Sequence, residues 1–187
     1  MYPIPVKNLI FSILNFILFA TPTWSQSKDP SPINFPIPNS IDHMLFYLQR
    51  DPNTNTLIYA LNFEKNVNIN PDHPIQVYWI RYGEKGQKKE LGYIQRKFGY
   101  GIDTKALGGD KYEFHFVSYK KLPFYLQRFP DKSYHVSVTV NKRTIKVNRL
   151  FVRIQGGSFW LPNVKYAEIE GIDEATGKSL VERVSVE

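Results

Sequence analysis

Aromatic rings and guanidinium groups are the residues of this sequence best suited to recognise a ligand. Aromatic faces stack on sugar rings, and the forked guanidinium of arginine binds carboxylates or phosphates through two hydrogen bonds. Such a set suits a glycan or an acidic polymer of the cell envelope. The candidate ligand-binding residues, which include one carboxylate, are Arg50, Tyr78, Trp79, Arg81, Glu90, Tyr100 and Trp160.

The same residues have a structural interpretation. In the run from residue 75 to 82 (IQVYWIRY), alternation along a strand places Trp79 and Arg81 on one face. If that face is the core, Arg81 needs a carboxylate partner, because an unpaired buried charge is costly. Glu90 and Glu113 are candidates for that role, so core packing with an internal ion pair remains the alternative.

Motifs that position a nucleophile, a metal or a phosphate are incomplete. The run Gly156 to Trp160 resembles a serine hydrolase elbow but lacks the final glycine of Gly-x-Ser-x-Gly. The four histidines are far apart in sequence, without the spacing of a zinc site. Gly108 and Gly109 are not followed by the lysine and hydroxyl residue of a phosphate-binding loop. The sequence therefore predicts no catalytic residue, no metal site and no cofactor.

The first 25 residues have the features of a signal peptide. Lys7 is the only charged residue, and an apolar stretch of about a dozen residues runs from Leu9 to Ala20. Cleavage after Ser25 would leave Gln26 at the N-terminus. An uncleaved anchor is the alternative, but the stretch is short for a span of roughly 20 residues. We expect an exported protein, periplasmic or secreted, with no membrane span after cleavage.

Composition narrows the class of protein and of partner. The chain has 187 residues and no cysteine, so the core alone must stabilise it without disulfides. Lysine and arginine number 24 against 17 acidic residues, and the net charge is +7. In an exported protein this balance suits acidic glycans, lipid head groups or an envelope polymer better than nucleic acid. Solubility is the alternative explanation, since the basic residues are interleaved with apolar ones.

Apolar alternation and turn residues divide the rest of the chain into strands. Residues 26–40 are rich in proline and form an extended lead-in, and residues 41–187 form one β-rich domain. A change to helical spacing predicts a helix over 88–98. The expected strands cover residues 43–50, 57–64, 75–82, 111–119, 134–140, 144–155, 164–170 and 179–186.

About eight strands with hairpin turns predict an all-β fold. We favour an antiparallel β-sandwich with one inserted helix, because strands such as 43–50 are apolar on both faces. An eight-stranded, calycin-like β-barrel is the alternative, and it would enclose a small ligand. The run FYLQR occurs twice, at 46–50 and at 124–128. Two related hairpins are one explanation of this repeat.

Several ordered motifs resemble a known family. They are HMLFYLQR from residue 43, PIQVYWIRY from 74, ELGYIQRKFGYGI from 90, GGSFWLPNVKYAEI from 156 and DEATGKSLVERV from 173. Together they resemble DUF4833, an exported bacterial domain of unknown function, over about residues 38–184. The resemblance implies no activity and no catalytic residue.

These observations favour a non-catalytic exported β-domain. Its expected role is that of an envelope-associated binding module or structural accessory protein for a glycan or acidic envelope polymer. A carrier of a small molecule or lipid is one alternative, and it requires an apolar cavity of a few hundred cubic ångströms. A hydrolase of envelope polymers is another, and it requires a cleft that joins Glu90, Glu113 or a histidine to Tyr100.

Overall fold

A computed structural model describes residues 34–64, 68–158 and 162–185. The predicted signal peptide, most of the predicted lead-in and Trp160 lie outside these residues. Residues 34–39 form neither helix nor strand. No helix in the described ranges is both long and apolar enough to cross a membrane.

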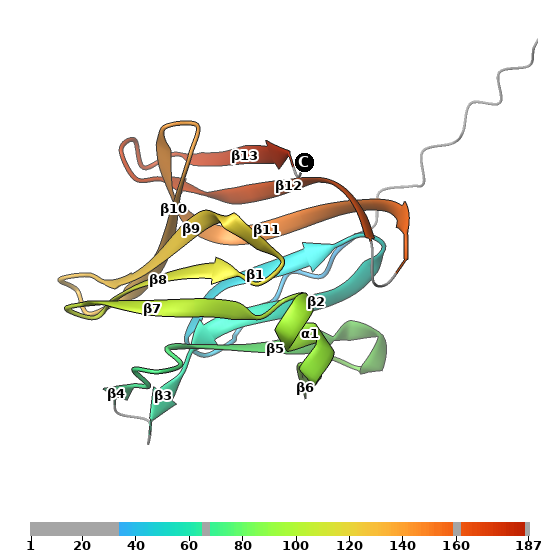
Figure 1. The fold of residues 1–187 in the computed structure, drawn as a ribbon, viewed down its shortest axis with the longest axis horizontal. Helices are drawn as coiled ribbons and strands as arrows, with labels where there is room; N and C mark the ends of the chain where they lie inside the picture. The colour runs from blue at the N-terminus through green and yellow to red at the C-terminus, as the bar shows by residue number, and fades with distance from the viewer. Residues whose placement is uncertain (1–33, 65–67, 159–161, 186–187) are drawn as a thin grey trace, which may run out of the picture. The chain divides into compact units, whose positions relative to one another are not determined.

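The described chain is mostly β-structure (Figure 1). Its strands are β1 (Met44–Arg50), β2 (Asn53–Leu61), β3 (Phe63–Glu64), β4 (Asn68–Ile69), β5 (Ile75–Arg81), β6 (Gln87–Glu90), β7 (Ile102–Gly108), β8 (Lys111–Phe116), β9 (Tyr119–Arg128), β10 (Tyr134–Val140), β11 (Arg143–Gly157), β12 (Pro162–Asp173) and β13 (Ser179–Ser185). Its helices are a 3-10 turn, η1 (Tyr82–Glu84), and α1 (Tyr93–Phe98).

Strand β11 joins two branches of one large mixed sheet. Residues 143–146 pair with β10, and residues 149–152 pair with β1 in parallel. From β10 the sheet continues to β9, β8 and β7, and from β1 it continues to β2, β5 and β6. The other edge of β11 pairs with β12, which pairs with β13. Figure 1 shows orange β11 between cyan β1 and red β12.

The core contains aromatic side chains from both branches. Phe46 of β1 stacks on Tyr59 of β2, with ring centroids 4.5 Å apart, and lies 6.3 Å from Phe114 of β8. Phe114 in turn stacks on Phe124 of β9. All four side chains are buried. The two branches therefore face each other, so the predicted all-β sandwich or barrel-like fold is confirmed.

A buried amide stabilises the opposite face of β1. Gln49 is 1% exposed, and its amide nitrogen donates to the carbonyl of Pro36 and to the hydroxyl of Thr56. Its amide oxygen accepts a 2.8 Å hydrogen bond from Arg149, which also pairs with Glu170 of β12. Because an unsatisfied buried amide is costly, these partners fix the register of β1 against β11.

The predicted strand pattern is correct for three hairpins and incomplete elsewhere. The hairpins β1–β2, β10–β11 and β12–β13 follow the predicted turns. Strands β7 and β9 lie in segments that the sequence left without a strand, and the short strands β3, β4 and β6 were not expected as separate strands. About eight expected strands thus become thirteen in the described residues. The parallel pairing of β1 with β11 was also not predicted, since it joins segments a hundred residues apart.

The predicted helix over 88–98 is wrong in its first half. Residues 87–90 form the edge strand β6, and only residues 93–98 are helical. Pairing with β5 satisfies backbone groups on β6 that a helix would satisfy internally, and Gly92 separates the two elements. The spacing of apolar residues alone does not distinguish a helix from a strand at residues 87–90, because pairing with β5 determines which of the two forms.

Phe46 tests the shared aromatic core. Phe46→Ala should lower the free energy of unfolding by about 3–5 kcal/mol, since it removes a ring in contact with both branches. Phe98→Ala makes the same chemical change at a ring that is 60% exposed, and it should cost about 1 kcal/mol or less. Urea denaturation of both variants measures the difference. Equal losses would contradict the assignment of the core.

Candidate functional site

A cavity of about 780 Å³ lies where the two branches diverge from β11. Its walls come from β1, β8, β9, β11, β12, β13 and the segment around α1. The apolar side chains that line it include Leu48, Ile94, Phe98, Phe116, Leu122, Phe124, Leu150, Val152, Ile154, Val164, Ala167, Ile169 and Val184. The size falls within the range of small-molecule pockets, about 300–1,000 Å³.

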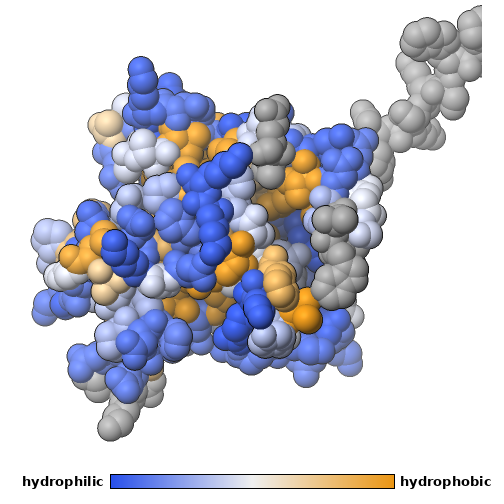
Figure 2. All heavy atoms as spheres, viewed as in Figure 1, coloured by the Kyte–Doolittle hydropathy of each residue, from blue (hydrophilic) through white to orange (hydrophobic). Residues whose placement is uncertain are grey.

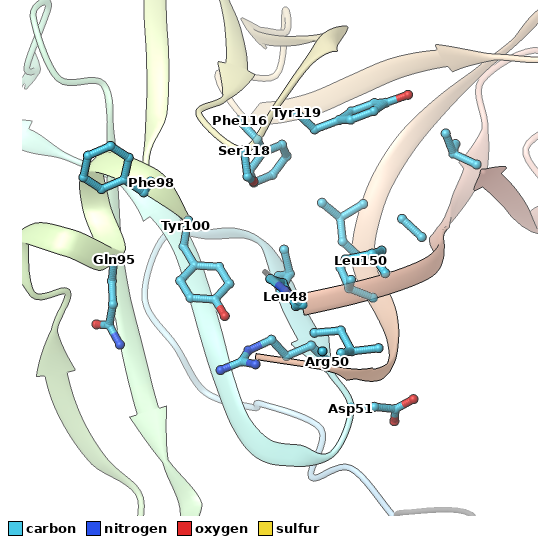
Figure 3. Close-up of a pocket in the computed structure, with 18 of the residues that line it drawn as sticks. Leu48, Arg50, Asp51, Gln95, Phe98, Tyr100, Phe116, Ser118, Tyr119 and Leu150 are labelled. Atoms are coloured by element: carbon cyan, nitrogen blue, oxygen red, sulfur yellow. The ribbon is translucent and has the colours of Figure 1, made fainter. Parts of the chain in front are cut away.

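Arg50 is the cation of this apolar cavity. It ends β1, and its guanidinium carbon lies 5.4 Å from the centroid of the Tyr100 ring and 6.0 Å from that of Trp79. Figure 3 shows its side chain extended below Tyr100, with the Tyr100 hydroxyl turned toward it. Among the described residues Arg50 forms no ion pair, and its buried Nε has no hydrogen-bond partner. The positive charge therefore lies against aromatic faces and beside the Tyr100 hydroxyl, to which Arg50 is hydrogen-bonded.

Asp51 does not neutralise Arg50, although it is the next residue. Its carboxylate lies 2.7 Å from the guanidinium of Arg153 on β11. Figure 3 shows the side chains of Arg50 and Asp51 pointing in different directions. The buried carboxylate thus has its own cation, so the charge of Arg50 has no internal counter-ion in the described part of the chain.

The wall that carries Tyr100 is fixed by hydrogen bonds to the sheet. The indole nitrogen of Trp79 donates to the Gln95 side-chain oxygen at 3.2 Å, and the Tyr59 hydroxyl donates to the Tyr100 carbonyl at 2.9 Å. Gly101 allows the chain to turn tightly after α1, because a Cβ there would lie 1.9 Å from the Arg96 carbonyl oxygen. These contacts hold α1 and Tyr100 against β2 and β5.

The Tyr100 hydroxyl stays protonated near neutral pH. Burial raises the pKa of Tyr100 above its usual value of 10.0, and the positive charge of Arg50 and its hydrogen bond to the phenol oppose only part of that increase. A neutral phenol can donate a hydrogen bond. Arg50 and Tyr100 thus place two donors at one end of the cavity.

The structure brings together three of the seven candidate ligand-binding residues. Arg50 and Tyr100 line the cavity, and Trp79 lies behind them, with its ring 5.3 Å from that of Tyr100. Ser158 and Pro162 also line the cavity, while Trp160 lies outside the described residues.

The other three candidates lie away from the cavity. Arg81 pairs with Glu84 at 2.7 Å, so the expected partners Glu90 and Glu113 were wrong. Glu90 lies on the edge strand and contacts Arg96 at 3.7 Å. Tyr78 points to the opposite face of β5 from Trp79, where the Lys88 ammonium lies over its ring.

The sequence did not indicate that Asp51, Ile94 and Phe98 line the cavity. Asp51 was interpreted as a turn residue, and its pairing with Arg153 depends on the unpredicted β1–β11 contact. Ile94 and Phe98 belong to the predicted helix over 88–98, but their place in the wall of the cavity was not predicted. The alternation of Leu150, Val152 and Ile154 along β11 is the signal that could have indicated an apolar wall.

The hydrolase hypothesis required acids or a histidine beside Tyr100. Glu113 instead pairs with His115 on β8, with 3.2 Å between the two side chains, and neither lines the cavity. Within the described ranges, no group of three or more histidine, aspartate or glutamate side chains has the geometry of a metal site.

In the part of the chain that the structure describes, an all-β domain encloses a largely apolar cavity, and Arg50 in its wall has no carboxylate partner. The sequence profile of the domain of unknown function DUF4833 matches residues 46–183. The chain therefore belongs to the DUF4833 family. Comparison with curated proteins and with solved structures found no match.

Substitution of Gly101 tests whether the tight turn after α1 fixes the cavity wall that contains Tyr100. Gly101→Ala forces the new methyl group against the Arg96 carbonyl and should cost about 1–3 kcal/mol of stability. Gly83→Ala is the matched control, since nothing lies within 4 Å of its Cβ position, and it should change stability by about 0.5 kcal/mol or less. Thermal or urea unfolding distinguishes the two. A tolerated Gly101→Ala would show that α1 is not fixed as described.

Removal of the charge of Arg50 and removal of the charge of Arg153 should have different effects on the free energy of unfolding. Arg50→Met removes a cation with no counter-ion and should leave the free energy of unfolding unchanged or higher. Arg153→Met leaves the buried Asp51 carboxylate unpaired and should cost about 1–3 kcal/mol. Urea denaturation without added ligand measures both. Destabilisation by Arg50→Met equal to that by Arg153→Met would contradict a ligand-directed charge.

Proposed function

We propose that this protein binds a small amphipathic anion, with an apolar body in the cavity and an acidic group on Arg50. The observation that carries the proposal is the guanidinium of Arg50, which lies at one end of a largely apolar cavity and has no carboxylate partner among the described residues. Arginine binds carboxylates and phosphates through paired hydrogen bonds, and Tyr100 supplies a further donor. The role is that of a binding module or carrier.

The cavity lining favours an acyl chain or similar body over a glycan. A sugar needs several polar partners for its hydroxyl groups, whereas the lining from β11 and β12 is largely leucine, valine, isoleucine and alanine. Burial of each methylene of a ligand against such a wall contributes about 0.8 kcal/mol. The apolar wall supplies affinity, and Arg50 supplies selectivity for an acid.

Binding of decanoate and of decanol tests this function. Both ligands are added in competition with aminoanthracene, a neutral fluorescent probe for apolar cavities. Arg50→Met should weaken decanoate binding roughly ten- to hundredfold, because a hydrogen-bonded charge contributes about 1.5–3 kcal/mol. Binding of decanol and of the probe should change little.

Two further variants serve as controls. Arg81→Met removes a cation that pairs with Glu84 away from the cavity, and it should bind decanoate as the wild type does. Ala167→Phe fills the cavity and should weaken the binding of decanoate, of decanol and of the probe alike. No decanoate binding by the wild type, or equal losses in Arg50→Met and Arg81→Met, would refute the proposal.

A further inference from the structure

The mouth of the cavity carries exposed apolar side chains. Ile94 and Phe98 lie four residues apart on α1 and both line the cavity, yet they are 39% and 60% exposed. Tyr93, on the same short helix, is 70% exposed. Figure 2 shows hydrophobic residues at the surface where Figure 1 places α1. The apolar lining of the cavity is therefore continuous with an apolar surface.

Two lysines lie beside this apolar surface. The Lys97 ammonium lies 5.5 Å from the centroid of the Tyr93 ring and 5.4 Å from that of Phe98, and it donates to the Tyr93 hydroxyl. Lys89 is exposed and lies opposite Trp79 across the β5–β6 pair, so it leaves the sheet on the side of α1. Arg96 is balanced by Glu90, which leaves the two lysines in excess.

We propose that α1, together with Lys89 of β6, docks on an anionic lipid bilayer and opens the cavity toward it. Aromatic side chains with a polar tip settle at the boundary between head groups and acyl chains, while lysines reach the anionic head groups. The inference rests on the proposed function, because the docking surface surrounds the mouth of the proposed ligand cavity. An acyl ligand would then pass between bilayer and cavity without crossing bulk water.

Vesicle sedimentation tests this docking surface. The wild type should sediment with vesicles of equimolar phosphatidylcholine and phosphatidylglycerol, less so with phosphatidylcholine alone, and less at high salt. Tyr93→Ser and Lys97→Gln should each lower the partition coefficient roughly fivefold, the effect of one favourable group at an anionic surface. Neither residue lines the cavity, so both variants leave its walls intact.

Two control variants remove an exposed apolar side chain and an exposed lysine charge away from α1. Val181→Ser alters a side chain that is 58% exposed on β13, and Lys105→Gln removes an exposed charge on β7. Both should sediment as the wild type does. Absence of sedimentation with anionic vesicles, or equal losses in controls and α1 variants, would overturn the docking surface.

Decanoate binding in solution separates this inference from the proposed function. If the wild type binds decanoate but not vesicles, the proposed docking surface is wrong and the proposed function stands. If it binds vesicles through Tyr93 and Lys97 but takes no decanoate, the proposed function fails and the surface remains as a membrane contact. If the wild type binds a soluble protein partner through Tyr93 and does not bind vesicles, the proposal that this surface contacts a bilayer is also wrong.

Discussion

Strand β11 pairs with β10 through its first residues and with β1 through later ones, and the rest of the domain is arranged around that shared edge. Two branches leave one strand, so they can meet only where side chains span the space between them. The aromatic stack of Phe46, Tyr59, Phe114 and Phe124 does so at the core. Further along β11 the branches diverge, and the apolar faces of β11 and β12 line a cavity there instead of a solid core.

The same arrangement determines the charge at the site. The parallel pairing of β1 with β11 ends at Arg50 and brings Asp51 to Arg153, which satisfies the carboxylate and leaves Arg50 beside Tyr100 and Trp79. A partly buried cation without a counter-ion is unfavourable for folding alone. The proposed ligand would supply the missing negative charge, so the feature that costs folding free energy is the one on which the proposed function rests.

The sequence was informative where structure is local and uninformative where distant segments meet. Turn residues predicted three hairpins, and both copies of FYLQR lie on strands, with Phe46 and Phe124 in the core. Arg50, Trp79 and Tyr100 were recognised by residue type alone. Their assembly, and the separation of Tyr78 and Arg81 from them, depends on the β1–β11 pairing and on the position of α1. No local pattern encodes those contacts, since they join segments far apart in the chain.

A structure of the protein with bound decanoate would show directly whether Arg50 holds the acidic group. We expect the carboxylate within hydrogen-bonding distance of the Arg50 guanidinium and near the Tyr100 hydroxyl. We also expect the acyl chain to run along Leu150 and Val152 of β11. A carboxylate that points to solvent, or a ligand bound outside the cavity with Arg50 untouched, would contradict the central claim that this arginine holds the acidic group.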